Sequence, residues 1–208
     1  MDPQPANLRG RLHAATAQAL LDAAEKAMLK YGYDKATMQQ IATETGCAPG
    51  TFYLYFKSKQ DIFDAIINRY MKTLFEKTRA AMDGSENPLE KMRLGIWACF
   101  QFARENKLFF QVALTSLPMR NRALRAKLME MGHTEHADMK RHSIEQLRLA
   151  QQMGLVRKDI PAETLDEFLD AVIFSFIEQF AMDDPIQSVE DKVKALWGLV
   201  TGGIVHEA

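Results

Sequence analysis

The sequence of 208 residues has only two cysteines, Cys47 and Cys99, and no long uninterrupted apolar run. Two thiols cannot build the disulfide framework that stabilises small secreted domains. A membrane-spanning helix needs about 20 consecutive apolar residues, and no apolar signal segment stands near the N-terminus. We therefore expect a cytoplasmic protein without a membrane partner.

The sequence also lacks any extended alternation of apolar and polar residues, and it contains no internal repeat. Alternation marks strands that are buried on one face, so its absence argues against a sheet. Hydrophobic residues make up 47% of the chain, which is enough for a buried core and excludes a disordered or fibrous class. We predict an all-α fold of about nine helices.

A strong excess of either charge is missing, because the formal net charge is −1. The composition as a whole therefore neither indicates nor excludes a polyanionic partner. The charges are unevenly distributed, however: residues 1–60 hold seven basic and five acidic residues, whereas residues 159–208 hold two and eleven. We do not expect the acidic C-terminal part to bind a phosphate backbone.

Helix boundaries follow from periodicity and from capping residues. A 3.6-residue period ends before Gly32, which predicts a first helix over about 13–31 with a left-handed cap. Residues 1–12 contain two prolines and no period, so we predict a flexible arm. Ser58, Asn87-Pro88, Pro161 and Asp184-Pro185 have the residue types of helix starts. The further helices are expected over about 59–84, 88–105, 119–154 with a possible break at Gly132, 161–181 and 185–204, with a short apolar element over 107–116.

The segment from Thr37 to Lys59, TMQQIATETGCAPGTFYLYFKSK, contains two short helical patterns separated by a glycine. Thr37 and Gln40 have the spacing of a capping box. Gly46 permits the positive φ of a sharp reversal, and Pro49 suits the first turn of the next helix. This pattern predicts a helix-turn-helix over about 37–56, whose second helix enters the major groove of DNA.

Several side chains of the second short helix are suited to contact DNA. Gly50 lets the backbone approach the duplex, and Thr51 is short enough to touch a base edge or a thymine methyl. Hydroxyl and ammonium donors that can reach phosphates are carried by Tyr53, Tyr55, Lys57 and Lys59. The alternative is a structural helical corner with tyrosines on its surface.

The stretch ATMQQIATETGCAPGTFYLYFKSKQDIF resembles the tetracycline-repressor-like (TetR/AcrR) family of bacterial regulators. It is similar to that family's threonine-started helix, glycine turn, Gly-Thr-x-Tyr and Phe-Lys-x-Lys signature. The resemblance covers residues 13–74, and beyond it only the length and the helical pattern agree. It implies a homodimeric repressor that a small molecule releases from a palindromic operator on double-stranded DNA. The positions that match DNA-contacting ones are Thr37, Gly50, Thr51, Tyr53, Tyr55 and Lys59.

The resemblance also implies two domains, a DNA-binding domain over 13–75 and a ligand-binding and dimerisation domain over 76–208. One position departs from the family pattern. Ala48 precedes Pro49 where a Ser or Thr cap is frequent, which costs about 1 kcal/mol of helix stability unless water or phosphate replaces the cap. Ala48 is either an apolar base contact or a neutral spacer, and we include Ala48 and Pro49 among the DNA-binding candidates.

The larger domain supplies candidates for an effector pocket and a dimer contact. Aromatic side chains suit an apolar or aromatic effector, although the same residues could be plain core; they are Trp97, Phe100, Phe109, Phe110 and Phe174. The candidate dimer residues form an apolar stripe and a pair of glycines that allow close helix approach; they are Phe168, Val172, Phe176, Trp197, Gly198 and Gly202.

Other polar groups give weaker signals. Glu130, His133, His136 and His142 contain one Glu-x-x-His spacing, whereas a carboxylate-bridged di-iron bundle needs two copies. We favour solvated histidines and predict no metal, no cofactor and no enzyme, since no catalytic triad or phosphate-binding glycine loop is present. A metal-dependent all-α enzyme and a DNA-binding protein without an effector are the alternatives. The run Arg120, Arg122, Arg125 and Lys127 is a solvated face or an anchor for an acidic ligand, and the role of Cys47 stays open.

Overall fold

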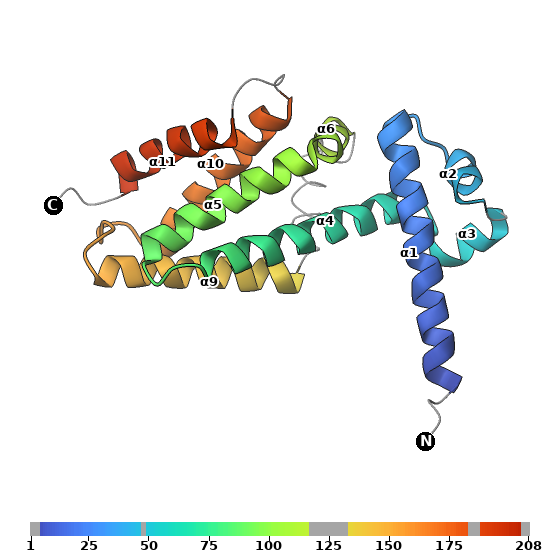
Figure 1. Cartoon of the computed structure of the whole chain (residues 1–208), viewed down its shortest axis with the longest axis horizontal. Helices are drawn as coiled ribbons and strands as arrows, with labels where there is room; N and C mark the ends of the chain where they lie inside the picture. The colour runs from blue at the N-terminus through green and yellow to red at the C-terminus, as the bar shows by residue number, and fades with distance from the viewer. Residues whose placement is uncertain (1–4, 47–48, 117–132, 183–187, 205–208) are drawn as a thin grey trace. The chain divides into compact units, whose positions relative to one another are not determined.

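The structure is a computed structural model that describes residues 5–46, 49–116, 133–182 and 188–204 (Figure 1). Over these ranges the chain forms nine α-helices and no β-strand, so the all-α prediction is confirmed. The helices are α1 (Pro5–Tyr31), α2 (Met38–Thr45), α3 (Pro49–Tyr55), α4 (Lys59–Met82), α5 (Pro88–Glu105), α6 (Lys107–Thr115), α9 (His133–Gln152), α10 (Ala162–Met182) and α11 (Val189–Ile204).

The chain divides into two compact units, each with its own core. The first unit contains the residues up to Arg69 and the end of α6, and the second contains the rest of α4, most of α6 and α5, α9, α10 and α11. The division therefore falls inside α4, a few residues before the boundary near residue 75 that the sequence suggested.

The core of the first unit is built from α1, α2, α3 and the first half of α4. In α1, Leu20, Ala24 and Ala27 recur at helical spacing and are at most 4% exposed, so one stripe of the helix packs inward. The tilted rings of Tyr33 and Phe63 have centroids 4.6 Å apart. The other buried apolar residues of this unit include Met28, Ala36, Ile41, Ala42, Phe52, Ile62, Ile66 and Ile67.

Helix α1 begins earlier than the sequence suggested. Residues 5–12, predicted to be a flexible arm, form its first turns. Pro5 is the first helical residue, where the missing N–H removes no hydrogen bond, so the prolines at the N-terminus do not prevent the helix. The other end was predicted correctly: Gly32 has φ +77°, and its N–H donates to the Met28 carbonyl at 2.8 Å.

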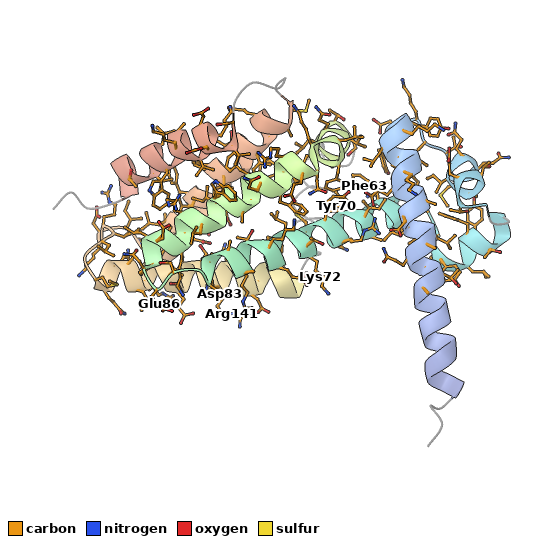
Figure 2. The ribbon with its side chains drawn as sticks, in the orientation of Figure 1. Phe63, Tyr70, Lys72, Asp83, Glu86 and Arg141 are labelled. Carbon is orange, nitrogen blue, oxygen red and sulfur yellow. The ribbon has the colours of Figure 1, made fainter. Side chains whose placement is uncertain are left out.

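The second unit is a bundle in which α5 packs against α9, α10 and α11. Its buried apolar side chains include Met92, Ile96, Phe100, Leu147, Leu165, Leu169, Val193, Leu196 and Val200. Helices α4 and α5 approach closely at Gly95, where an added Cβ would lie 3.1 Å from Met82 Cγ and 3.4 Å from Thr78 Cγ2. Tyr70, which is labelled in Figure 2, stacks on Phe109 with ring centroids 3.5 Å apart.

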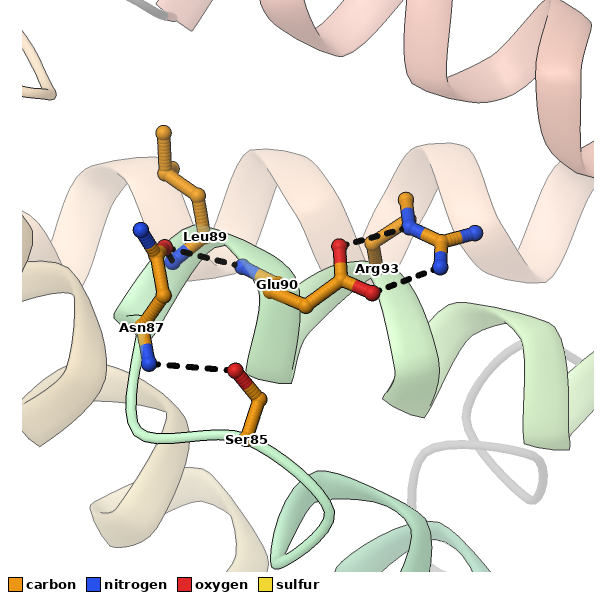
Figure 3. A network of polar contacts seen from close by, with 5 residues as sticks. All are labelled: Ser85, Asn87, Leu89, Glu90 and Arg93. Atoms are coloured by element: carbon orange, nitrogen blue, oxygen red, sulfur yellow. Dashed lines mark hydrogen bonds and ion pairs between the residues drawn. The ribbon is translucent and has the colours of Figure 1, made fainter.

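The start of α5 shows how a local signal fixes a helix in this unit (Figure 3). The side-chain oxygen of Asn87 accepts from the N–H groups of Leu89 at 2.9 Å and Glu90 at 3.2 Å. Pro88 occupies the first turn. The Glu90 carboxylate binds Arg93 at 2.6 and 2.8 Å. The predicted span of 88–105 is confirmed.

The last helix starts later than expected. The sequence placed its start at Asp184-Pro185, which lies outside the described residues, whereas α11 begins at Val189. Ser188 is its capping residue, because the Ser188 hydroxyl oxygen accepts from the Asp191 N–H at 3.0 Å. In the sequence, the Ser-x-x-Asp spacing of Ser188 and Asp191 is typical of such a helix start.

Candidate nucleic-acid interface

The capping box at the start of α2 is formed in full. Thr37 is extended (φ −96°, ψ 154°), and its hydroxyl oxygen accepts from the Gln40 N–H at 3.2 Å. In return, the Thr37 N–H donates to the Gln40 side-chain oxygen at 2.8 Å. Ile41 and Ala42 follow with exposures of 0% and 2%. The predicted start and inner face of this helix are confirmed.

The reversal after α2 uses the predicted glycine. Gly46 adopts the left-handed conformation (φ 66°, ψ 11°), and its N–H donates to the Thr43 carbonyl. Helix α3 then begins at Pro49, so the predicted pair of short helices is present. Cys47 and Ala48, including the open question of the α3 cap, lie outside the described residues.

Helix α3 has one buried and one exposed face. Phe52 is 1% exposed and anchors the helix in the core, while Thr51 and Tyr55 are half-buried. Gly50 is exposed, and Tyr53 and Leu54 are 54% and 80% exposed. Since residues three and four apart share a helix face, these three residues form what we name the outer face of α3. Leu54 was not among the predicted contacts.

The two candidate lysines after α3 have different environments. The Lys59 ammonium donates to the main-chain carbonyls of Tyr33 at 2.9 Å and Asp34 at 3.3 Å, and it lies 4.6 Å from the centroid of the Tyr33 ring. The Lys57 side chain is exposed. The Lys59 ammonium is therefore bound to the turn that follows α1, whereas the Lys57 side chain is exposed.

The segment from Ser58 to Asp61 fixes the start of α4 beside these lysines. The Asp61 N–H donates to the Ser58 hydroxyl at 3.1 Å, and the Lys57 N–H donates to the Asp61 carboxylate at 3.0 Å. The predicted helix start at Ser58 is thus present, with the acid Asp61 in the first turn. Because this carboxylate binds the main chain of Lys57 and not its ammonium, the Lys57 side chain stays exposed beside α3.

Ion pairs attach the helix-turn-helix to α1. The Glu44 carboxylate on α2 accepts from the Lys30 ammonium at 3.1 Å and from the Tyr31 hydroxyl at 3.2 Å. These hydrogen bonds lower the pKa of Glu44 below its ordinary value. The Arg69 guanidinium of α4 pairs with two carboxylates of α1, those of Asp22 and Glu25. These contacts position α2 and α4 on one scaffold.

The candidate effector residues in the second unit do not share one environment. Phe100, Phe109 and Phe110 are 0%, 5% and 8% exposed and belong to the core of the unit. Trp97 is 41% exposed, and Phe174 is half-buried. Their assignment to a pocket therefore stays a prediction.

The interior of the second unit is more polar than the sequence suggested. Thr78 Oγ1 and Cys99 Sγ are 3.4 Å apart, and burial raises the pKa of the Cys99 thiol to about 11. Asp166 is 1% exposed. Asp170 is exposed as a residue, yet burial of its carboxyl, reinforced by the Asp166 carboxylate, raises the pKa of Asp170 to about 6. In the sequence, Asp166 and Asp170 are four positions apart, and each directly follows a leucine, Leu165 or Leu169. This spacing was the signal from which a pair of neighbouring carboxyl groups could have been predicted.

The candidate dimer residues lie on exposed or half-exposed parts of α10 and α11. Phe168 is 54% exposed, and an added Cβ at Gly198 or Gly202 would meet no atom within 4 Å. Leu199, which the sequence reading did not single out, is 63% exposed between these glycines. The remaining candidates, Val172, Phe176 and Trp197, are half-buried.

The described residues contain no group of three or more His, Cys, Asp or Glu side chains that could hold a metal ion. His133 and His136 belong to α9, whereas Glu130 and the basic run from Arg120 to Lys127 fall outside the described ranges. Within those ranges, no helix has the length and apolar character that a bilayer crossing requires.

Comparison with known proteins supports the assignment of a helix-turn-helix. Residues 20–66, which span the last part of α1, α2, α3 and the start of α4, match the sequence model of bacterial regulatory proteins of the tetR family. The HTH-type transcriptional repressor BepR of Brucella suis is 29% identical over 171 residues, which cover 80% of this chain and 81% of that protein. Residues 20–66 are thus the DNA-binding segment of a TetR-family regulator. The chain is a DNA-binding transcriptional regulator.

Other regulators extend the comparison beyond residues 20–66. The HTH-type regulator YhgD of Bacillus subtilis is 29% identical over 93 residues, so the match spans only 49% of its length and 45% of this chain. The crystal structure of FadR from Bacillus subtilis, in complex with stearoyl-CoA, superposes with a TM-score of 0.75 at 22% identity and covers 90% of this chain and 98% of that one. This likeness shows that the TetR-family fold continues through the second unit.

Proposed function

We propose that this TetR-family regulator is a homodimeric, cytoplasmic repressor that binds a palindromic operator through α2 and α3 and is released by a small apolar effector. The observation that carries the DNA-binding part is the capped α2, the left-handed Gly46 and the exposed outer face of α3 within the family-matched segment. No described feature supports the alternative of a metal-dependent enzyme, and the relatives are named as regulators.

For the DNA contacts, we assign different roles to the two lysines. Lys57 is exposed beside α3 and is proposed to bind a phosphate. Lys59 is proposed to act mainly by positioning, because its ammonium already donates to two carbonyls. The other proposed contacts follow the sequence prediction and are Thr37, Ala48, Pro49, Gly50, Thr51, Tyr53 and Tyr55.

The proposed dimer forms through α10 and α11. Exposed apolar side chains on these helices, Phe168 and Leu199 among them, lose contact with water if they face a second copy. Gly198 and Gly202 leave open space beside the α11 backbone, which allows a partner helix to come close. Replacing Gly202 with a bulky residue should therefore yield monomer in sedimentation experiments, and a persistent dimer would place the interface elsewhere.

The proposed effector site lies in the second unit, near Trp97 and Phe174. Stearoyl-CoA, found in the FadR structure of Bacillus subtilis, carries a long alkyl chain, and apolar burial of this kind can supply most of the affinity. Fluorescence titration of Trp97→Phe and Trp197→Phe variants with acyl-CoA esters tests the site. A ligand that releases DNA and perturbs only Trp197 would contradict the location, and loss of the response in Trp97→Phe alone would support it.

Operator selection from random duplex DNA tests the DNA-binding proposal. We expect an enriched palindrome with half-site centres about 34–36 Å or a multiple apart. On that operator, Lys57→Ala should reduce the slope of log affinity against log salt by about one. Lys59→Ala, the matched control, should leave the slope nearly unchanged and lower the stability of the first unit. The absence of any enriched sequence, or a bound single half-site, would overturn the proposal.

A further inference from the structure

The most exposed large apolar side chain among the described residues is Leu54, at 80%. It lies on α3, the helix that the proposed function places in the major groove. We propose that Leu54 reads the C5-methyl group of a thymine, and so fixes a thymine at one position of each operator half-site. This inference rests on the proposed function and adds a source of sequence preference to it.

The chemistry of the side chain limits what it can recognise. Leucine has no polar atom, so it can neither bind a phosphate nor form a hydrogen bond with a base edge. The thymine methyl is the apolar group that the four base pairs present in the major groove. Contact between the two removes both from water, and this gain is absent when cytosine, which lacks the methyl, replaces thymine.

The surroundings of Leu54 show that internal packing does not explain its position. The helix is held in the core by Phe52, which is 1% exposed, whereas Leu54 stands on the outer face with Gly50 and Tyr53. An added Cβ at Gly50 would meet no atom within 4 Å, and Gly50 does not have a positive φ. The fold therefore does not require a glycine there, and the absence of a side chain leaves room for a duplex to approach this face.

Thr51 is the other candidate for contact with a thymine methyl, because the sequence analysis proposed that contact for it. Its side chain is half-buried, and because threonine branches at Cβ, its methyl lies one carbon closer to the backbone than the methyls of leucine. Leu54 extends further from the helix axis and is far more exposed. The geometry thus favours Leu54 for the contact and leaves Thr51 closer to the helix backbone.

The experiment removes single methyl groups from the DNA. Each thymine of the selected operator is replaced in turn, in both half-sites, by deoxyuridine, which differs only at C5. For the wild-type protein we expect one symmetric position at which the replacement weakens binding about fourfold per half-site, the effect of about one buried methyl group. Leu54→Ala should bind the unmodified operator more weakly and should lose the sensitivity at that position only.

Two further variants keep the test specific. Leu149→Ala removes a leucine on α9 that is 41% exposed, and it should keep the wild-type deoxyuridine profile. Circular dichroism should show that Leu54→Ala is folded, because little packing is lost. An unchanged methyl sensitivity in Leu54→Ala, or its loss in Thr51→Ser instead, would overturn the inference while operator binding stands. Failure to select any operator would overturn the proposed function, and this inference with it.

Discussion

The two units of this regulator are specified in different ways. In the first unit, each helix end near the DNA-binding face is set by a residue within a few positions of it: Thr37 and Gln40 start α2, Gly46 ends it, and Ser58 starts α4. In the second unit, the interior depends on contacts between residues far apart in sequence, as between Thr78 and Cys99. Local signals thus set the ends of α2 and the start of α4, whereas the interior of the second unit depends on long-range packing.

This difference has a physical origin. Helices of seven or eight residues, such as α3 and α2, are too short to be stable alone, so capping bonds and one or two buried anchors decide whether they form. In the second unit, helices α5, α9, α10 and α11 are 16 to 21 residues long. For helices of that length, the packing of an apolar face supplies most of the stability. The comparison can be tested by substitutions in both units.

The largest effect is expected from removing one core ring in each unit. Phe52→Ala and Phe100→Ala replace side chains that are 1% and 0% exposed, and each should cost about 3–5 kcal/mol of stability. Because the units have separate cores, urea unfolding of Phe52→Ala, followed by circular dichroism, should show an early transition of the first unit alone. A single transition shifted equally by both substitutions would show that the units unfold together.

A smaller effect is expected from the α2 cap. Thr37→Ala removes the oxygen that accepts from the Gln40 N–H and should cost about 1 kcal/mol, measured by thermal unfolding. Thr43→Ala is the matched control on the same helix, since its exposed hydroxyl donates only to the Gln39 carbonyl and alanine favours the helix. Equal losses in the two variants would mean that the capping bond is not what holds α2.

The pH dependence of stability should differ between the units. The pKa of Asp170, raised from 3.8 to about 6, means that the folded state binds this proton more tightly than the unfolded state. The contribution of Asp170 to the free energy of unfolding should therefore rise as the pH falls from about 6 to about 4. Asp170→Asn should remove this rise in urea titrations. A pH profile that is the same in the variant would show that the carboxyl titrates normally.

The smallest effect is expected for Glu44 in the first unit, and it has the opposite sign. Its pKa is lowered by hydrogen bonds from Lys30 and Tyr31, so its stabilisation is present above the ordinary glutamate pKa and is lost as the pH falls. The pair is exposed to solvent, which screens it. Glu44→Gln should cause a slight loss at neutral pH and none in acid, and a loss that grows in acid would contradict this sign.

The sequence predicted the parts that depend on neighbours in the chain. The capping boxes, the left-handed glycines and the start of α5 needed only spacing and residue type. The sequence did not reveal that Lys59 faces the Tyr33 and Asp34 carbonyls, because those acceptors lie more than twenty positions away. The sequence analysis also singled out neither the exposed Leu54 nor the buried Asp166, since exposure depends on which face of a helix the tertiary structure covers.

The Lys59 contact has a consequence for how this turn can evolve. Its acceptors are main-chain carbonyls, which every amino acid provides. A change of the exposed side chain at position 34 therefore leaves the acceptor of this contact in place. A search for paired substitutions would find no covariation between positions 34 and 59, although the two residues are in direct contact. In this turn, the contact depends on the lysine side chain at position 59 and on the main chain at position 34.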